Sequence, residues 1–134
     1  MDFHTATDQA IRDVEACPEA DSDAVHAALQ LAAHAWQLCQ QPRDASGWDL
    51  FGTGLQAALA NLPPPEQPIA ILIEEQSLPD SEAVRRDAAR LATSVASRLD
   101  AAAGDPGAAP NRRWAWSTAA ARLRAAAEDL MELA

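Results

Sequence analysis

The side chains best suited to metal binding or nucleophilic chemistry are three histidines and two cysteines, and their spacing favours neither. His26 and His34 are eight residues apart on one predicted helix, so they lie about two turns from each other. Cys39 falls on the opposite, apolar face of that helix. A metal site needs at least three converging ligands. We therefore expect no metal, solvated His26 and His34 on a polar helix face, and His4 in a frayed terminus.

Two pairs of adjacent carboxylates, Glu74-Glu75 and Glu128-Asp129, are equally unsuited to catalysis. Neighbouring residues of a helix diverge by about 100°, so neither pair converges on one substrate atom. The chain also lacks a Glu-x-x-His motif and a G-x-S-x-G nucleophile turn, and no basic residue lies within a turn of His26. The sequence therefore predicts a protein that is not an enzyme and has no cofactor.

The net charge of −10 belongs entirely to the first 78 residues. Residues 1–78 contain twelve acidic side chains and two arginines, whereas residues 79–134 contain eight of each. All ten basic residues are Arg, which fits a GC-rich coding bias. A charge asymmetry of this kind indicates binding partners rather than chemistry.

Four of the acids, Glu15, Glu19, Asp21 and Asp23, cluster around one predicted helix junction. They could simply be solvated, serve helix dipoles or pair with the chain's own arginines. Projecting outward as one patch, they would instead capture a basic protein partner, as immunity proteins, antitoxins and regulatory adaptors do. This second interpretation requires that Arg85, Arg86, Arg90 and Arg98 do not neutralise them.

The segment Arg112-Arg113-Trp114 is a second candidate for partner binding. Trp114 lies nearly opposite the apolar stripe that contains Trp116, and tryptophan beside arginine is typical of interface anchors. The alternative is that Trp114 folds back over the preceding Gly/Pro loop or packs on a neighbouring helix. The negative net charge argues against nucleic acid as the partner, and this surface could also serve a homodimer.

A different class of function is suggested by the aromatic side chains. Trp36, Trp48, Phe51 and Trp116 lie within an Ala-rich interior, where small residues could leave a cavity. These four residues are the candidate pocket of a small-molecule-binding helical bundle, acting as a regulator or accessory protein of a biosynthetic pathway.

Apolar periodicity and capping residues predict an all-α fold, an antiparallel bundle of four to five helices. Thr5, Ser22 and Asp80 are the predicted N-caps of three of them. Gly52 and Gly54 weaken the third helix, so a neighbouring helix should approach closely there. The predicted helices are 6–16, 23–41, 48–62, 81–103 and 112–133.

The chain has the size of one domain, residues 1–134, with a possible internal boundary at Pro63–Pro65. The segment Ile69–Ile73 has strand-like β-branched content but no partner strand, so we expect a short buried helix there. This apolar run is too short to span a membrane. Cys17 and Cys39 form no disulfide framework, and we expect reduced thiols in the cytoplasm.

Overall fold

The computed structural model describes residues 1–40, 46–65, 68–71 and 73–132, and it is all-α. Its only strands in the described part of the chain are β1 and β2, two residues each, which pair in parallel. The five helices form the bundle that the sequence predicts. The elements are α1 (Phe3–Ala16), α2 (Asp23–Leu38), β1 (Cys39–Gln40), α3 (Ser46–Ala60), β2 (Leu78–Pro79), α4 (Glu82–Ala103) and α5 (Pro110–Glu132).

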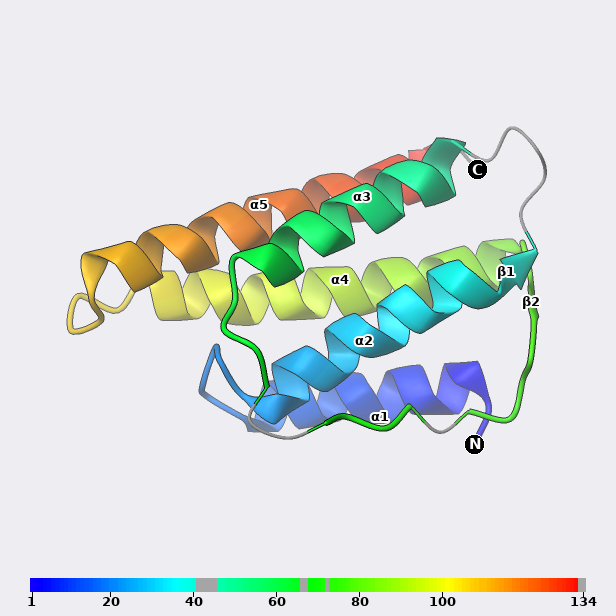
Figure 1. Ribbon diagram of the computed structural model, residues 1–134, viewed down its shortest axis with the longest axis horizontal. Helices are drawn as coiled ribbons and strands as arrows, with labels where there is room; N and C mark the ends of the chain where they lie inside the picture. The colour runs from blue at the N-terminus through cyan, green and yellow to red at the C-terminus, as the bar shows by residue number, and fades with distance from the viewer. Residues whose placement is uncertain (41–45, 66–67, 72, 133–134) are drawn as a thin grey trace.

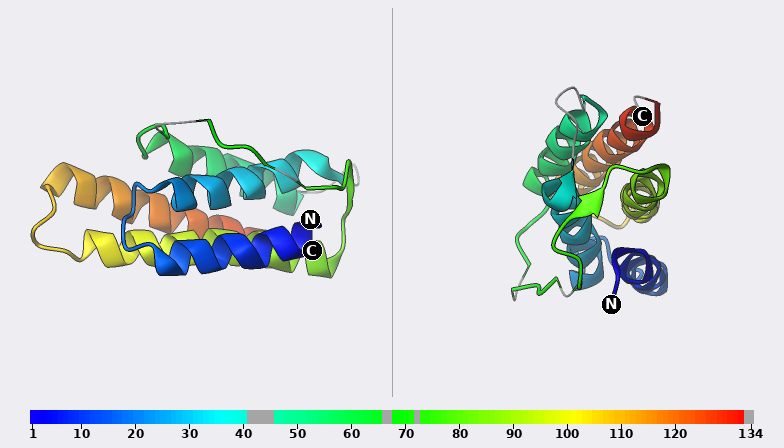
Figure 2. Two further views of the ribbon diagram at one scale, coloured as in Figure 1. Left: turned by 90° about the horizontal axis from the view of Figure 1, so that it is seen from below. Right: turned by 90° about the vertical axis from the view of Figure 1, so that its right-hand side faces the viewer.

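Helices that follow one another through short loops are antiparallel, but α3 and α4 run in the same direction (Figure 1). The segment between them returns from the end of α3 to the end of the bundle where α4 begins (Figure 1). Figure 2 shows α5 lying beside both α3 and α4, while α1 and α2 form the opposite part of the bundle. The α1–α2 turn and the α4–α5 loop therefore lie at the same end of the molecule, and β1 and β2 lie at the other end.

The core is centred on α4, which contacts α1, α2 and α5. Its buried stripe, Ala88, Leu91, Val95 and Leu99, follows spacings of three and four residues, as helix-on-helix packing requires. Helix α3 precedes the triple proline in the sequence, and α5 comes after it. These two helices pack along each other. The two halves of the chain therefore share one hydrophobic core.

Two glycines of α3 allow the close approach expected from the sequence. A Cβ placed on Gly52 would lie 2.2 Å from the Trp36 ring, and one on Gly54 would lie 2.8 Å from the Ala126 Cβ of α5. Glycine lowers the helix propensity at these positions, but it permits tight packing against the neighbouring side chains. Gly52 makes room for an indole and Gly54 for a neighbouring helix.

The caps of α1 and α4 differ from the prediction by one to three residues. Asp2, not Thr5, caps α1, and its carboxylate accepts a hydrogen bond from the Thr5 amide at 2.7 Å. Ser81, not Asp80, caps α4, whereas Ser22 caps α2 as predicted. Asp80 has another role, because it binds Arg85 and Trp48 below the start of α4.

The prediction of a helix over Ile69–Ile73 is wrong at the described residues, which have neither helical nor strand structure. Pro63–Pro65, Pro68 and Pro79 have no amide hydrogen to donate. The segment must also return along the length of α3, and an extended chain advances about 3.3 Å per residue against 1.5 Å in a helix. Ile71 and Ile73 are half-buried against the core, while Leu72 lies outside the described residues.

Candidate functional site

Asp21, in the α1–α2 turn, joins the two segments that the sequence analysis treated as separate candidates. Its carboxylate accepts one hydrogen bond from Arg112 Nη2 at 2.5 Å and another from Trp116 Nε1 at 3.0 Å. The Arg112 guanidinium also lies over the Trp116 ring, 5.3 Å from its centroid. These contacts hold the α1–α2 turn against the first turns of α5. We call the four exposed acids at the end of α1, in the α1–α2 turn and at the start of α2 the acidic corner: Glu15, Glu19, Asp21 and Asp23.

The other three carboxylates of the acidic corner are exposed. Glu15, Glu19 and Asp23 have no side-chain hydrogen bond or ion pair among the described residues. Arg98 lies nearby, but its Nη2 donates to the backbone oxygen of Glu15 and not to a carboxylate of the corner. The acidic corner therefore contains three free carboxylates beside one that is already neutralised.

Three arginines of α4 are bound to carboxylates outside the acidic corner. Arg85 binds Asp80, Arg86 binds Glu82, and Arg90 bridges two aspartates at the junction of α1 and α4. None of these three guanidiniums binds a carboxylate of the acidic corner. Among the described arginines, Arg112 is the one that binds such a carboxylate, that of Asp21.

The structure separates Trp114 from its two neighbouring arginines. Arg112 is bound to Asp21, and Arg113 Nε donates to the Ala103 carbonyl at 2.8 Å, which fastens the α4–α5 loop. Both arginines are half-buried and engaged within the chain. The Trp114 side chain is 67% exposed, so the alternative in which it packs on the loop or on a neighbouring helix is wrong.

The aromatic residues proposed as a ligand pocket do not surround a common space. Trp48 and Phe51 are fully buried and pack edge to face, with ring centroids 5.7 Å apart. The Trp36 ring lies against Gly52, and Trp116 belongs to the Asp21 cluster at the end of the bundle. Three of the rings fill the core instead of lining a cavity, because the small residues beside them let helices approach until the space is closed.

Histidine 26 is buried, so its predicted solvation is wrong. Its Nδ1 lies 3.0 Å from the Ser22 carbonyl oxygen, and its Nε2 lies 2.6 Å from the Pro63 carbonyl oxygen. A neutral imidazole donates to only one of these oxygens, whereas the imidazolium donates to both. His26 thus ties α2 to the start of the returning segment. His34 is only partly exposed on its helix.

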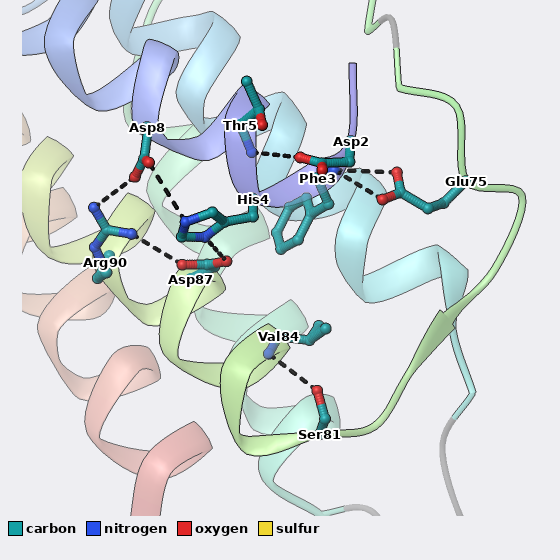
Figure 3. A network of polar contacts seen from close by, with 10 residues as sticks. All are labelled: Asp2, Phe3, His4, Thr5, Asp8, Glu75, Ser81, Val84, Asp87 and Arg90. Atoms are coloured by element: carbon teal, nitrogen blue, oxygen red, sulfur yellow. Dashed lines mark hydrogen bonds and ion pairs between the residues drawn. The ribbon is translucent and has the colours of Figure 1, made fainter.

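Histidine 4 is also part of an ordered structure and not of a frayed end. Its Nδ1 lies 2.8 Å from Asp87 Oδ2 of α4, and its Nε2 lies 3.5 Å from Asp8 Oδ2, one turn along α1. Arg90 closes the ring, with 2.9 Å contacts to both aspartates. Figure 3 shows these four side chains meeting between α1 and α4.

The charges of this ring shift the protonation of its members. The hydrogen bond to Asp87 and the nearby Asp8 raise the pKa of His4 above 6.5, and the Arg90 guanidinium lowers the pKa of Asp8. Both nitrogens of His4 face carboxylates, not a hydroxyl or a thiol. The arrangement is suited to holding two helices together, and it activates no nucleophile.

Within the described ranges, no three His, Cys, Asp or Glu side chains are arranged to hold a metal ion, and no described helix is long and apolar enough to cross a bilayer. Cys17 and Cys39 are both free thiols, and burial raises the pKa of the Cys39 thiol to about 11.

The sequence indicates the acids of the acidic corner but not the contacts that they make with other helices. The contact of Asp21 with Arg112 joins residues 91 positions apart, and no local pattern indicates it. The ring around His4 left a partial signal, because Asp87 and Arg90 are spaced as a helical ion pair. Their docking onto α1 depends on tertiary packing alone. Comparison with protein-family models, with curated proteins and with solved structures found no match.

Proposed function

We propose that this chain is a non-enzymatic protein-binding module whose acidic corner captures a basic protein or protein domain. The observation that carries the proposal is the set of exposed carboxylates of Glu15, Glu19 and Asp23, which have no partner among the described residues. Clustered like charges repel one another in the free protein. A cationic partner relieves that repulsion on binding.

The fixed position of the α1–α2 turn supports the proposal. Asp21 is bound by Arg112 and Trp116, so the turn that carries Glu19 and Asp23 is held by side-chain contacts with α5. A surface that is ordered before binding loses less conformational entropy when the partner arrives. The net charge of −10 adds long-range attraction for a cationic protein, which raises the association rate and weakens with salt.

Trp114 supplies a separate contact in this proposal. It is exposed on the side of α5 away from Trp116, and it shares that side with the exposed Ala121 and Ala125. Large aromatic side chains dominate the binding energy of many interfaces. Trp114 therefore serves either a second part of the partner or self-association into a dimer.

The class of protein that best fits these features is an immunity protein, an antitoxin or a regulatory adaptor acting in the cytoplasm. Such proteins act by covering a basic surface of their target. Nucleic acid is a poor candidate partner, because its phosphates would be repelled by the acidic corner. A ligand pocket at Trp36, Trp48, Phe51 and Trp116 is less favoured, because the first three rings pack in the core and Trp116 is bound to Asp21.

Charge reversal tests the proposal. The variant Glu19→Arg/Asp23→Arg and the wild type are each immobilised and exposed to lysate of the cells that encode the protein, at low and at high salt. A protein retained by the wild type at low salt is then purified. We expect its association rate with the double variant to fall at least tenfold, because the steering field is removed.

The matched control is Glu128→Arg/Glu132→Arg, which makes the same charge change on exposed positions near the other end of α5. This control should bind the partner with an association rate within about threefold of the wild type. Equal losses in both variants would mean that only total charge matters. That result, or binding insensitive to Glu19→Arg/Asp23→Arg, would refute the acidic corner as the binding surface.

A further inference from the structure

A groove runs along the side of the bundle formed by α1 and α4, and one residue of the acidic corner, Glu15, contributes to its lining. It has a volume of about 590 Å³, which is within the usual range of small-molecule sites. Its apolar side chains come from three helices: Ile11 and Val14 of α1, Ala89 and Ala101 of α4, and Met131 of α5. The groove is thus formed where α1, α4 and α5 pack together.

Most polar side chains of the groove come from one face of α4. Arg86, Arg90 and Arg98 line it, and Glu15 is the one acid among the described residues of its lining. This face lies opposite the buried stripe of α4. Arg86 is paired with Glu82, and Arg90 is paired with Asp8 and Asp87, whereas Arg98 has no ion pair among the described residues.

Most hydrogen-bond donors of the groove are unused. A guanidinium has five N–H donors, yet Arg86 and Arg98 each make a single hydrogen bond, to Glu82 and to the Glu15 carbonyl. The Nε of Arg98 is buried without an acceptor. A rotation of the Arg98 side chain onto a bound anion would therefore sacrifice only one hydrogen bond.

Three hydroxyls add to this set of donors. Thr93, Ser94 and Ser97 line the groove between the arginines, and none of their hydroxyls has a hydrogen-bond partner among the described residues. Thr53, in contrast, donates to the Asp49 carbonyl one turn earlier, as helical hydroxyls commonly do. The groove thus combines unpaired donors with an apolar floor.

We propose that this groove binds a small amphipathic anion, with a carboxylate or phosphate head on the donors of α4 and an apolar body against Ile11, Val14 and Met131. Guanidinium groups match both head groups through paired N–H donors. This site differs from the aromatic set that the sequence suggested, and it shares Glu15 with the acidic corner.

The test uses the full chain labelled with ¹⁵N and three probes that share one apolar body: decanoate, decyl phosphate and decanol. We expect saturable binding of decanoate or decyl phosphate by calorimetry, with amide shifts concentrated at Ala89, Thr93, Ser97 and Ala101. Whichever anion binds more tightly identifies the preferred head group. Decanol should bind at least tenfold more weakly than that anion, since it lacks the charge.

Two groove variants and one control complete the test. Arg86→Gln and Arg98→Gln should each raise the Kd of the tighter anion at least fivefold, while Arg122→Gln, an exposed arginine outside the groove, should change it less than twofold. Ser97→Trp fills the groove and should abolish binding with an unchanged helical circular dichroism spectrum. The proposal is overturned if neither anion saturates, if decanol binds equally well, or if Arg122→Gln weakens binding as much as Arg98→Gln.

Discussion

Gly52 carries a packing role that no larger side chain can take over. A Cβ at this position would lie 2.2 Å from Trp36 Cε2, well inside van der Waals contact. Gly52→Ala should therefore destabilise the protein by about 1–3 kcal/mol, the usual cost of overpacking, despite the better helix propensity of alanine. Chemical denaturation monitored by circular dichroism measures the change.

Gly104→Ala is the matched control for this substitution. The nearest atom to a Cβ on Gly104 is the Ala101 carbonyl oxygen at 3.5 Å, and the backbone there is right-handed helical. Its free energy of unfolding should change by less than about 0.5 kcal/mol. A Gly52→Ala protein as stable as Gly104→Ala would contradict the tight contact with Trp36.

Asp80 is the centre of a buried ionic cluster at the start of α4. Arg85 binds it through Nε at 2.6 Å and Nη2 at 2.9 Å, and the Trp48 Nε1 donates to it at 2.9 Å. Asp80→Ala would leave the buried guanidinium unpaired and should cost about 3–5 kcal/mol. Glu82→Ala, which removes the exposed ion pair with Arg86, should cost less than about 1 kcal/mol in the same denaturation experiment.

The same cluster makes the stability of the protein depend on pH in the acidic range. The hydrogen bonds from Arg85 lower the pKa of Asp80 below its ordinary value of 3.8. A carboxyl group with a lowered pKa stabilises the fold above its unfolded pKa, and this stabilisation is lost as the pH falls through the folded pKa. Unfolding titrations should therefore show a loss of stability below about pH 4 that is smaller in Asp80→Ala.

His4 gives a dependence of the opposite sign. Asp87 and Asp8 raise its pKa, so its imidazolium stabilises the docking of α1 on α4 at low pH. That contribution is complete below pH 6.5 and is lost as the pH rises through the folded pKa. The NMR titration of the His4 ring should have its midpoint above 6.5, and Asp87→Asn should lower it. A midpoint unchanged by Asp87→Asn would exclude the contact in solution.

At the scale of the elements, local signals decide where helices begin. The Ser22 side chain accepts a hydrogen bond from the Val25 amide at 3.3 Å, as a cap should. Ser22→Ala should cost about 1 kcal/mol of stability. Ser117→Ala, at an exposed position inside α5, should leave the thermal midpoint nearly unchanged and serves as the comparison.

The elements that sequence reasoning predicted correctly are those defined by their own residues. Ser22 caps the start of α2, and the apolar stripe from Ala88 to Leu99 identifies α4. The segment Ile69–Ile73 was misjudged because its path is set by the distance between the end of α3 and the start of α4. His26 was misjudged for the same reason, since the Pro63 carbonyl that buries it belongs to that path.

At the scale of the whole molecule, the two halves of the chain differ in net charge but are not spatially separate. Helices from both halves enclose the same core, so the triple proline marks a change of composition within one packed unit. The candidate site was only half predictable from sequence. The acids of the corner were visible in the charge count, whereas their tie to α5 required the fold.

The contact of Asp21 with Arg112 and Trp116 also makes Trp116 an intrinsic fluorescent probe of binding at the α1–α2 turn. An indole emits at a wavelength that depends on the charge and water around it, and the Trp116 ring is in contact with both Asp21 and Arg112. In a Trp114→Phe background, docking of a cationic protein on the α1–α2 turn should shift the emission of Trp116. The change in Trp116 emission caused by Lys or Arg side chains of a partner would thereby measure binding without a dye attached to the chain.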